Sequence, residues 1–378
     1  MEHSDIKSIP ENKIKNFSNK IDSLQVVRAI AFIIIFISHC NSEFPGEIGV
    51  SIFLVLSGFC MVYSYYNKNL GTSLKECFAF SKKKISKLYV LHILTTVAAI
   101  FISVKTLSIG SKIVNIVLHG ILLFVNALLI KTWIPNSIYY YSLNSVSWYL
   151  CICIFLCMVF PLILKKLQKS DCKKSIITII CVYTLQITSS YMLRNFSAFN
   201  TVSDNFTKWF TYIFPLYRLG DFMIGCCLGH IFVENLISLN KIMASILELF
   251  SIAFIILSLY IYIGKLTVLS EPCFCHTVLF IPGSVFFVFS FAQNKGLISK
   301  LITTSPQLIW LGNISAYAFL IHQLVIRYTE FLYTKLTATT MNMYIKIIFT
   351  FTVTICCCMA YRKIESYIKS RIEHNAQS

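Results

Sequence analysis

Charged residues are scarce in this chain. Only 13% of its 378 residues are Asp, Glu, Lys or Arg, whereas 56% are hydrophobic, and soluble domains carry roughly 25% charged residues. The mean hydropathy is +0.71, and the apolar residues gather in runs long enough to cross a membrane. This composition excludes an ordinary soluble domain and indicates a polytopic membrane protein.

The start of the chain lacks the features of a cleavable signal peptide. Its first stretch, MEHSDIKSIPENKIKNFSNKI, is polar and holds no apolar core before a small-residue cleavage site. We therefore expect residues 1–23 to form a cytoplasmic N-terminal tail and residues 24–361 to form the transmembrane domain. Residues 362–378 are then expected to form a cytoplasmic C-terminal tail.

Recognition motifs for nucleic acid and for metal are also missing. The net charge is +17, but no basic segment interleaved with aromatic residues forms a nucleic-acid module. Most of the fifteen cysteines lie inside apolar runs such as CICIFLC and ICCCMA, where they serve as small packing residues. CFCH (273–276) has no second pair of ligands nearby. We expect no metal, no tightly bound cofactor and no nucleic-acid partner.

Apolar runs of membrane-spanning length recur along the chain without an internal repeat. Eleven candidates lie at 25–40, 48–66, 85–104, 113–130, 146–164, 175–192, 211–233, 243–263, 275–292, 308–333 and 344–361. A span needs roughly 17 to 25 residues, so polar residues at its ends must lengthen the first candidate.

Two lysine-rich segments determine the predicted topology. KKKISK (82–87) and KKLQKSDCKK (165–174) both belong on the cytoplasmic side of the membrane. If the candidates at 85–104 and 113–130 both crossed, the second segment would lie outside. We therefore predict that 113–130 is re-entrant or interfacial. About ten spans remain, in an all-α transmembrane helix bundle with both termini cytoplasmic.

Arg28 and His39 interrupt the first apolar run, VVRAIAFIIIFISHC. Ionisable residues inside a span are costly, so they are functional candidates. The eleven residues between them turn a helix by about 1100°, which places both on one face, roughly 17 Å apart. The structural alternative is an Arg28 that snorkels to the cytoplasmic headgroups and a His39 that is hydrogen-bonded within the bundle.

Three further ionisable residues are candidates. Arg218 and Asp221, in YRLGDF, are three residues apart and can pair on one helix face, either as a structural ion pair or as part of a site. His322, in LGNISAYAFLIHQ, is either a functional group or a hydrogen-bonded core residue.

Aromatic and small residues give two weaker signals. Trp148 follows the aromatic-rich stretch IYYYSLNSVS on the predicted outer side, where it would belong to an interfacial belt or form a platform for a sugar ring. The small residues of GVSIFLVLSGF (49–59) predict close packing between helices.

The ordered set of these motifs resembles the membrane-bound acyltransferase-3 family, whose members acylate sugars and other cell-surface acceptors. Arg28 and His39 match the pattern of its first helix, GVSIFLVLSGF resembles its second, and KKKISKLYVLH resembles the basic entry to its third. WYLCICIFLCMVFP, YRLGDFMIG and LGNISAYAFLIHQ then follow in family order. The resemblance covers residues 21 to about 330.

Two positions depart from the family pattern. Lys84 and Lys87 stand where the family usually has arginine, which keeps the charge but loses bidentate phosphate binding. Cys153 stands where the family commonly has a carboxylate, so the role of that carboxylate is not expected here.

The resemblance implies an O-acyltransferase of the plasma membrane, most simply in a bacterium. Its donor would be acetyl-coenzyme A or another acyl-coenzyme A used as a co-substrate, and its acceptor a saccharide or a lipid-linked glycan. The donor's phosphates would bind Arg28, Lys83, Lys84 and Lys87. His39 would be the general base, because its unperturbed pKa lies near neutrality.

A secondary transporter or a flippase for a lipid-linked sugar is the alternative function, because buried charges also line transport pathways. Transporters often contain two-fold repeats and helix pairs broken by Gly or Pro. The sequence shows neither feature.

Overall fold

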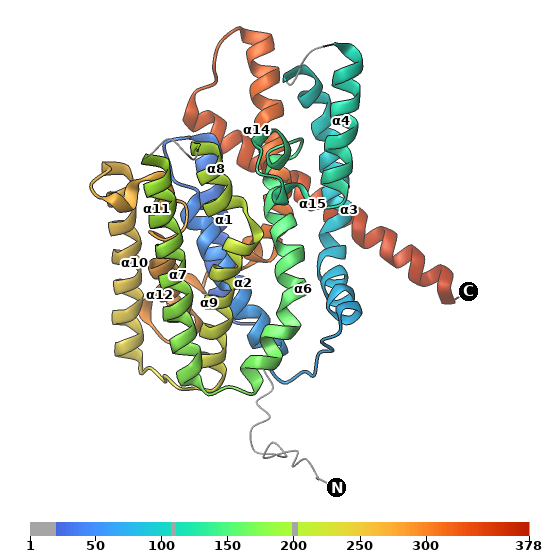
Figure 1. Ribbon diagram of the computed structural model, residues 1–378. Coiled ribbons are helices and arrows are strands. Elements are labelled where there is room, and N and C mark those ends of the chain that lie inside the picture. Colours follow the sequence, from blue (N-terminus) through green and yellow to red (C-terminus); the bar gives the residue numbers. More distant parts are fainter. Residues whose placement is uncertain (1–19, 107–110, 199–202, 378) are drawn as a thin grey trace.

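The computed structural model describes residues 20–106, 111–198 and 203–377, and over these residues the protein is a bundle of α-helices without strands (Figure 1). Among the described residues, nine helical segments are long and apolar enough to cross a membrane. The chain is a multi-pass membrane protein, and the predicted all-α polytopic fold is confirmed.

The long helices begin and end close to the predicted apolar runs. They are α1 (Asp22–Cys40), α2 (Glu47–Tyr65), α3 (Leu74–Thr106), α6 (Trp148–Gln168), α7 (Cys172–Ala198), α9 (Pro215–Val233), α10 (Lys241–Gly264), α14 (Pro306–Thr337) and α15 (Met343–Gln377). α8 (Asp204–Lys208) and η4 (Trp209–Ile213) extend the span of α9. The shorter helices are α4 (Lys112–Ala127), η2 (Lys131–Trp133), α5 (Ser137–Tyr140), η3 (Ser145–Ser147), η5 (Val268–Ser270), α11 (Pro272–Cys275), α12 (Ile281–Ala292) and α13 (Leu297–Ile302).

The span predicted at 275–292 is a helix over only part of its length. α12 begins at Ile281, and Pro282 lies in its first turn, where the missing N–H of proline has no helical partner to lose. The residues just before α12 form a buried turn. α12 ends beside the start of α1, where the Ser23 hydroxyl donates to the Phe291 carbonyl at 2.6 Å.

The candidate at 113–130 is too short to span the membrane alone. α4 has 16 residues, which at 1.5 Å per residue is about 24 Å, whereas the hydrocarbon core is about 30 Å thick. α4 lies beside the far end of α3 (Figure 1), and the chain then returns through short helices to α6. This arrangement agrees with the predicted non-spanning segment.

The two lysine-rich segments lie at one end of the bundle, which we call the lysine-rich end. Lys165, on the last turns of α6, donates to the Thr72 hydroxyl at 3.2 Å, and Gln168 donates to the Lys68 carbonyl at 3.2 Å. Thr72 and Lys68 belong to the connection that enters α3. Residues 82–87 follow within the first turns of α3.

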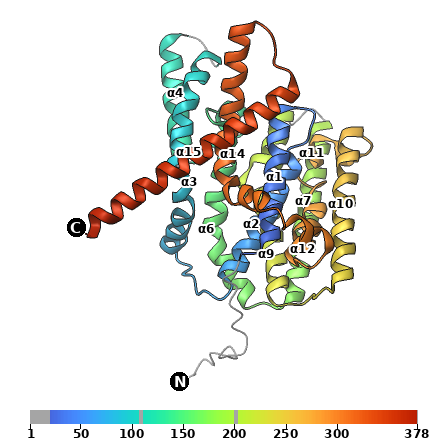
Figure 2. The same ribbon diagram turned by 180° about the vertical axis from the view of Figure 1, so that it is seen from behind.

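The two predicted tails differ in what the structure describes. α15 continues through residue 377 and projects away from the bundle (Figures 1 and 2), so the predicted C-terminal tail is helical over 362–377. Most of the predicted N-terminal tail, residues 1–19, lies outside the described residues.

Glycines allow the central helices to approach closely. A Cβ on Gly49 would lie 2.7 Å from the Ala31 carbonyl oxygen of α1, and one on Gly58 would lie 2.2 Å from the Phe222 carbonyl oxygen of α9. Real Cβ atoms essentially never come this close to another atom. The close packing predicted for residues 49–59 is therefore confirmed at both glycines.

Candidate active site

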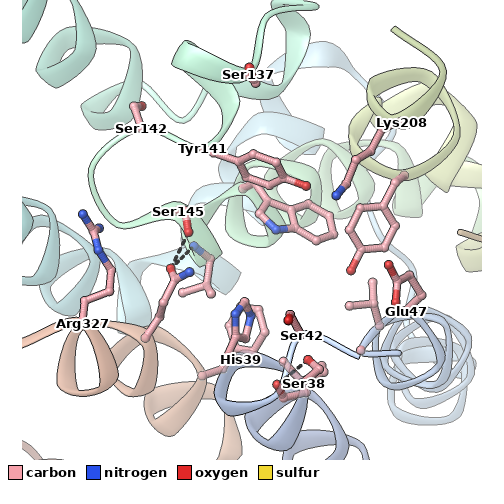
Figure 3. A pocket seen from close by; sticks show the side chains of 18 of the residues that line it. Ser38, His39, Ser42, Glu47, Ser137, Tyr141, Ser142, Ser145, Lys208 and Arg327 are labelled. Carbon is pink, nitrogen blue, oxygen red and sulfur yellow. Dashed lines mark hydrogen bonds between the residues drawn. The ribbon is translucent and has the colours of Figure 1, made fainter. Parts of the chain in front are cut away.

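A cavity of about 640 Å³ lies at the end of the bundle opposite the lysine-rich end (Figure 3). It is formed by the end of α1, the start of α2, the end of α3, α5 with the chain between it and α6, α8 with η4, the end of α10 and the middle of α14. Most of the polar groups in its wall are hydroxyls. The serines are Ser38, Ser42, Ser103, Ser137, Ser142 and Ser145, and the aromatic residues are Phe44, Tyr141, Trp148, Tyr212, Tyr262 and Phe319.

His39 lies in the wall of this cavity, on the last turn of α1. Its side chain is accessible, whereas the preceding apolar face of α1, including Phe32 and Phe36, is buried. Figure 3 shows the imidazole facing the open space between the two sides of the cavity. The predicted general base is therefore within reach of a molecule in the cavity.

His322 lies directly behind His39. The two ring centroids are 5.0 Å apart, and the His322 side chain is fully buried among Phe32, Phe36 and Phe319. Its Nδ1 is 2.8 Å from the Phe319 carbonyl oxygen. Because a carbonyl only accepts, this contact requires a proton on Nδ1. Nε2 is then an acceptor, and it has no partner among the described residues.

Trp148 belongs to the cavity wall. Its side chain is 5% exposed, and its ring lies 4.8 Å from that of Tyr212. An interfacial belt would expose the ring to lipid, so the burial of Trp148 argues against that alternative. Tyr141 also lines the cavity (Figure 3). Burial, Tyr140 and Glu47, in that order, raise the pKa of the Tyr141 hydroxyl, so it stays a neutral hydrogen-bond donor.

A short segment before α6, which we call the rim (residues 142–146), is fastened to α14. Gln323 accepts hydrogen bonds from the Ser145 hydroxyl and, at 3.2 Å, from the Val146 N–H. Arg327 donates to the Leu143 carbonyl at 2.8 Å. Sequence reasoning missed Gln323 and Arg327. Their three- and seven-residue spacing from Leu320 on α14 was the available signal, because it places them on one helix face.

Charged residues occupy both sides of the cavity. Glu47 and Lys208 lie on one side and Arg327 on the other, with His39 between them (Figure 3). Glu47 is the first residue of α2, and its carboxylate is 3.5 Å from Nδ1 of His276. Sequence reasoning missed Glu47, although a carboxylate directly before an apolar run could have indicated it.

Arg218 and Asp221 lie outside the cavity lining. They form an ion pair at 2.9 Å in which both side chains are fully buried. Gln186 donates to Asp221 at 2.8 Å, and Arg218 donates to the Thr277 hydroxyl and to the His276 carbonyl. The pair therefore joins α9 to α7 and to the turn before α12, as a structural ion pair would.

The predicted donor-binding residues do not line the cavity. Arg28 is half-buried on α1 with Nη1 3.4 Å from the Gln25 amide oxygen. Lys84 lies with its ammonium 4.3 Å from the centroid of the Tyr65 ring. Lys83 and Lys87 are exposed. The described residues thus do not show these four cations converging on one point.

The described lining residues include neither a serine hydrogen-bonded to His39, as an activated nucleophile would be, nor the family's usual carboxylate. Among the described side chains, His39 makes no hydrogen bond to a serine or a cysteine (Figure 3). The Ser38 hydroxyl donates a hydrogen bond to the Ile35 carbonyl at 2.7 Å. Cys153, at the position of the carboxylate, is not among the lining residues.

Comparison with known proteins shows which family the chain belongs to. A family model described as an acyltransferase domain matches residues 21–362. The chain belongs to the acyltransferase-3 family. It is also similar to acyltransferase MdmB from Streptomyces mycarofaciens, with 26% identity over 187 residues. That match covers 48% of this chain and 45% of MdmB, so it spans less than half of either protein.

No solved structure matches the chain. The chain is thus a member of a family of acyltransferases, and its described residues include nine helical segments long and apolar enough to cross a membrane.

Proposed function

We propose that this acyltransferase moves an acyl group, most simply acetyl, from acyl-coenzyme A to a hydroxyl of a cell-surface saccharide or its lipid-linked precursor. The observation that carries the proposal is the accessible His39 imidazole in a cavity lined by hydroxyls and aromatic rings. Aromatic faces and polar side chains together suit a sugar, whose rings carry both C–H faces and hydroxyls.

His39 is the general base of the proposed reaction. It takes the proton of the acceptor hydroxyl while the hydroxyl oxygen attacks the thioester carbonyl carbon. The tetrahedral intermediate then collapses, the C–S bond breaks, and the proton on His39 returns to the leaving thiolate. Acyl ester and free coenzyme A result, without an acyl-enzyme, which agrees with the absence of a serine or cysteine bonded to His39 among the described side chains.

His322 sets the tautomer of His39 in this mechanism. With the His322 Nδ1 proton donated to the Phe319 carbonyl, the Nε2 lone pair has no partner among the described residues, and the His39 ring centroid lies 5.0 Å from that of His322. An N–H of His39 pointing at that lone pair leaves the other His39 nitrogen unprotonated and directed to the cavity. This logic resembles the orienting partner of a catalytic triad.

The donor is proposed to enter from the lysine-rich end, which we assign to the cytoplasmic face of a bacterial plasma membrane. Its phosphates would contact Arg28 and Lys84, with Lys83 and Lys87 adding positive charge at the surface. Arg28 lies eleven residues before His39 on α1, roughly 17 Å along the helix axis. The pantetheine arm would cover that distance, and the acceptor would enter from the opposite end.

Variants of His39 test the proposal through the O-acyl content of surface glycans, measured by mass spectrometry. A strain lacking the gene should lose a specific O-acyl group and regain it with the wild-type gene. His39→Ala and His39→Gln should both lower the initial rate of acylation by about 10² to 10⁴, because neither side chain accepts a proton at neutral pH. His119→Gln, on α4 and outside the cavity lining, is the matched control.

Two results would count against the proposal. Near-normal acylation by His39→Gln at normal membrane abundance would remove His39 as the base. An unchanged glycan in the deletion strain, together with gradient-dependent uptake of a lipid-linked sugar into vesicles, would favour the transporter or flippase. The acyltransferase needs no gradient to release coenzyme A from acetyl-coenzyme A.

A further inference from the structure

Lys131 is a charged residue that the proposed reaction does not use. It lies in η2, between α4 and the rim, and its side chain has no exposed surface. Its ammonium donates to the Ser142 carbonyl at 3.2 Å and to the Asn144 carbonyl at 3.0 Å. Among the described residues, no carboxylate pairs with it. A buried ammonium without a counter-ion is costly, so the two carbonyls must compensate for lost hydration.

The rim depends on these contacts because residues 142–144, which precede the short helix η3, are not in regular secondary structure. Leu143 has a φ of 53°, in the left-handed region that non-glycine residues rarely adopt. Its carbonyl is bound by Arg327, so two cations hold three successive carbonyls, those of residues 142, 143 and 144. In a helix these carbonyls would accept hydrogen bonds from backbone N–H groups. Here they accept them from side chains of η2 and α14.

Neutral side chains fasten the same segment from two sides. Asn126 of α4 donates to the Ser142 hydroxyl at 2.6 Å, and Asn144 donates to the Leu320 carbonyl of α14 at 2.9 Å. Leu320 is followed on the same face of α14 by Gln323 and Arg327, which also bind the rim. Lys131 is thus the charged contact on the side of the rim away from α14.

We propose that Lys131 is a positioning residue, which together with Arg327 holds the rim in the shape that closes the cavity across from His39. The reason is where the rim residues point: Ser142, Leu143, Ser145 and Val146 all line the cavity, and Figure 3 shows Ser142 and Ser145 above His39. The catalytic consequence rests on the proposed function, because the rim would fix the acceptor relative to the base. The positioning of the rim itself does not depend on the proposed function.

The charge of Lys131 offers a readout that simple packing would not change. Burial lowers the pKa of Lys131 to about 8, with Cys151 on α6 opposing the shift. Among the described residues, His92 on α3 also interacts electrostatically with Lys131. The ammonium is therefore charged below about pH 8 and neutral above it. The rim should loosen as the pH rises through this value, because a neutral amine binds carbonyls more weakly.

Hydrogen exchange of the peptide that contains the rim tests this proposal in the full-length protein, in lipid nanodiscs and without any substrate. Lys131→Met keeps the length of the side chain and removes the donor, and it should raise exchange in residues 142–147 by roughly 10-fold or more at pH 7. Lys131→Arg keeps its charge at pH 9 and should abolish the extra exchange that the wild type shows there. Lys112→Met, at an exposed position on α4, is the matched control and should match the wild type.

The exchange of α9 shows whether a variant is folded, because this helix lies outside the rim contacts. Rim exchange in Lys131→Met equal to that of Lys112→Met, with α9 protected, would overturn the proposal. So would equal loss of protection in the rim and in α9, since Lys131 would then stabilise the whole fold. If the variant loosens only the rim, its O-acylation in cells should fall by roughly 10-fold. A wild type without acylation would contradict the proposed function and leave the exchange result to decide the role of Lys131.

Discussion

Replacing His322 tests whether it orients the catalytic base or only fills space. In the proposed reaction His39 becomes an imidazolium, and its N–H then donates to the Nε2 lone pair of the fully buried His322. The 5.0 Å between ring centroids permits this contact. A hydrogen bond to a charged group contributes about 1.5 to 3 kcal/mol, so its loss should slow turnover roughly 10- to 150-fold.

Two substitutions at position 322 separate these roles. His322→Leu leaves no acceptor and should show the full loss. His322→Gln retains an amide oxygen that can accept the His39 N–H and should keep most of the rate. Phe32→Leu, which changes the packing against the same ring at a residue outside the cavity lining, is the control. The assay is the initial rate of coenzyme A release from acetyl-coenzyme A in membrane vesicles with the surface glycan fraction of the deletion strain, normalised to protein abundance.

The outcomes are distinct. A Leu variant within twofold of the wild type would show that His39 needs no orienting partner. Equal losses in the Leu and Gln variants would assign His322 to packing, since the accepting oxygen would then make no difference. Both results would leave His39 as the base but would remove His322 from the mechanism.

Two predictions concern stability, measured as unfolding in detergent. Gly58→Ala places a Cβ 2.2 Å from the Phe222 carbonyl oxygen and should destabilise the protein by about 1 to 3 kcal/mol; Gly120→Ala, where no atom lies within 4 Å, should be neutral or stabilising, and equal effects would refute the packing argument. Arg218→Met leaves the fully buried Asp221 unpaired and should cost about 3 to 5 kcal/mol. Adding Asp221→Asn should recover much of this loss, and no recovery would show that the pairing is not the cause.

The sequence by itself determined the membrane class, nearly all of the spans and the main candidate base. Insertion into a bilayer depends on the summed transfer free energy of neighbouring residues, which can be read along the chain. The two lysine-rich segments were predicted to lie on the same side of the membrane, and in the structure they lie at the same end of the bundle. His39 was a candidate because an ionisable side chain inside an apolar run is costly to insert and is therefore usually functional. The helix at 281–292 came out shorter than its apolar run because Pro282 marks where it starts.

Only the tertiary structure decided which residues meet. His322 lies behind His39, Glu47 and Lys208 enter the cavity, and Lys131 holds the rim, although these residues are far apart in sequence. The Arg218 and Asp221 pair matched the family pattern equally well, yet it lies outside the cavity lining. Hydropathy and spacing specify which face of a helix is apolar, but the partner of that face depends on how helices from distant parts of the chain pack. That packing determines the cavity, its rim and the contacts of its base.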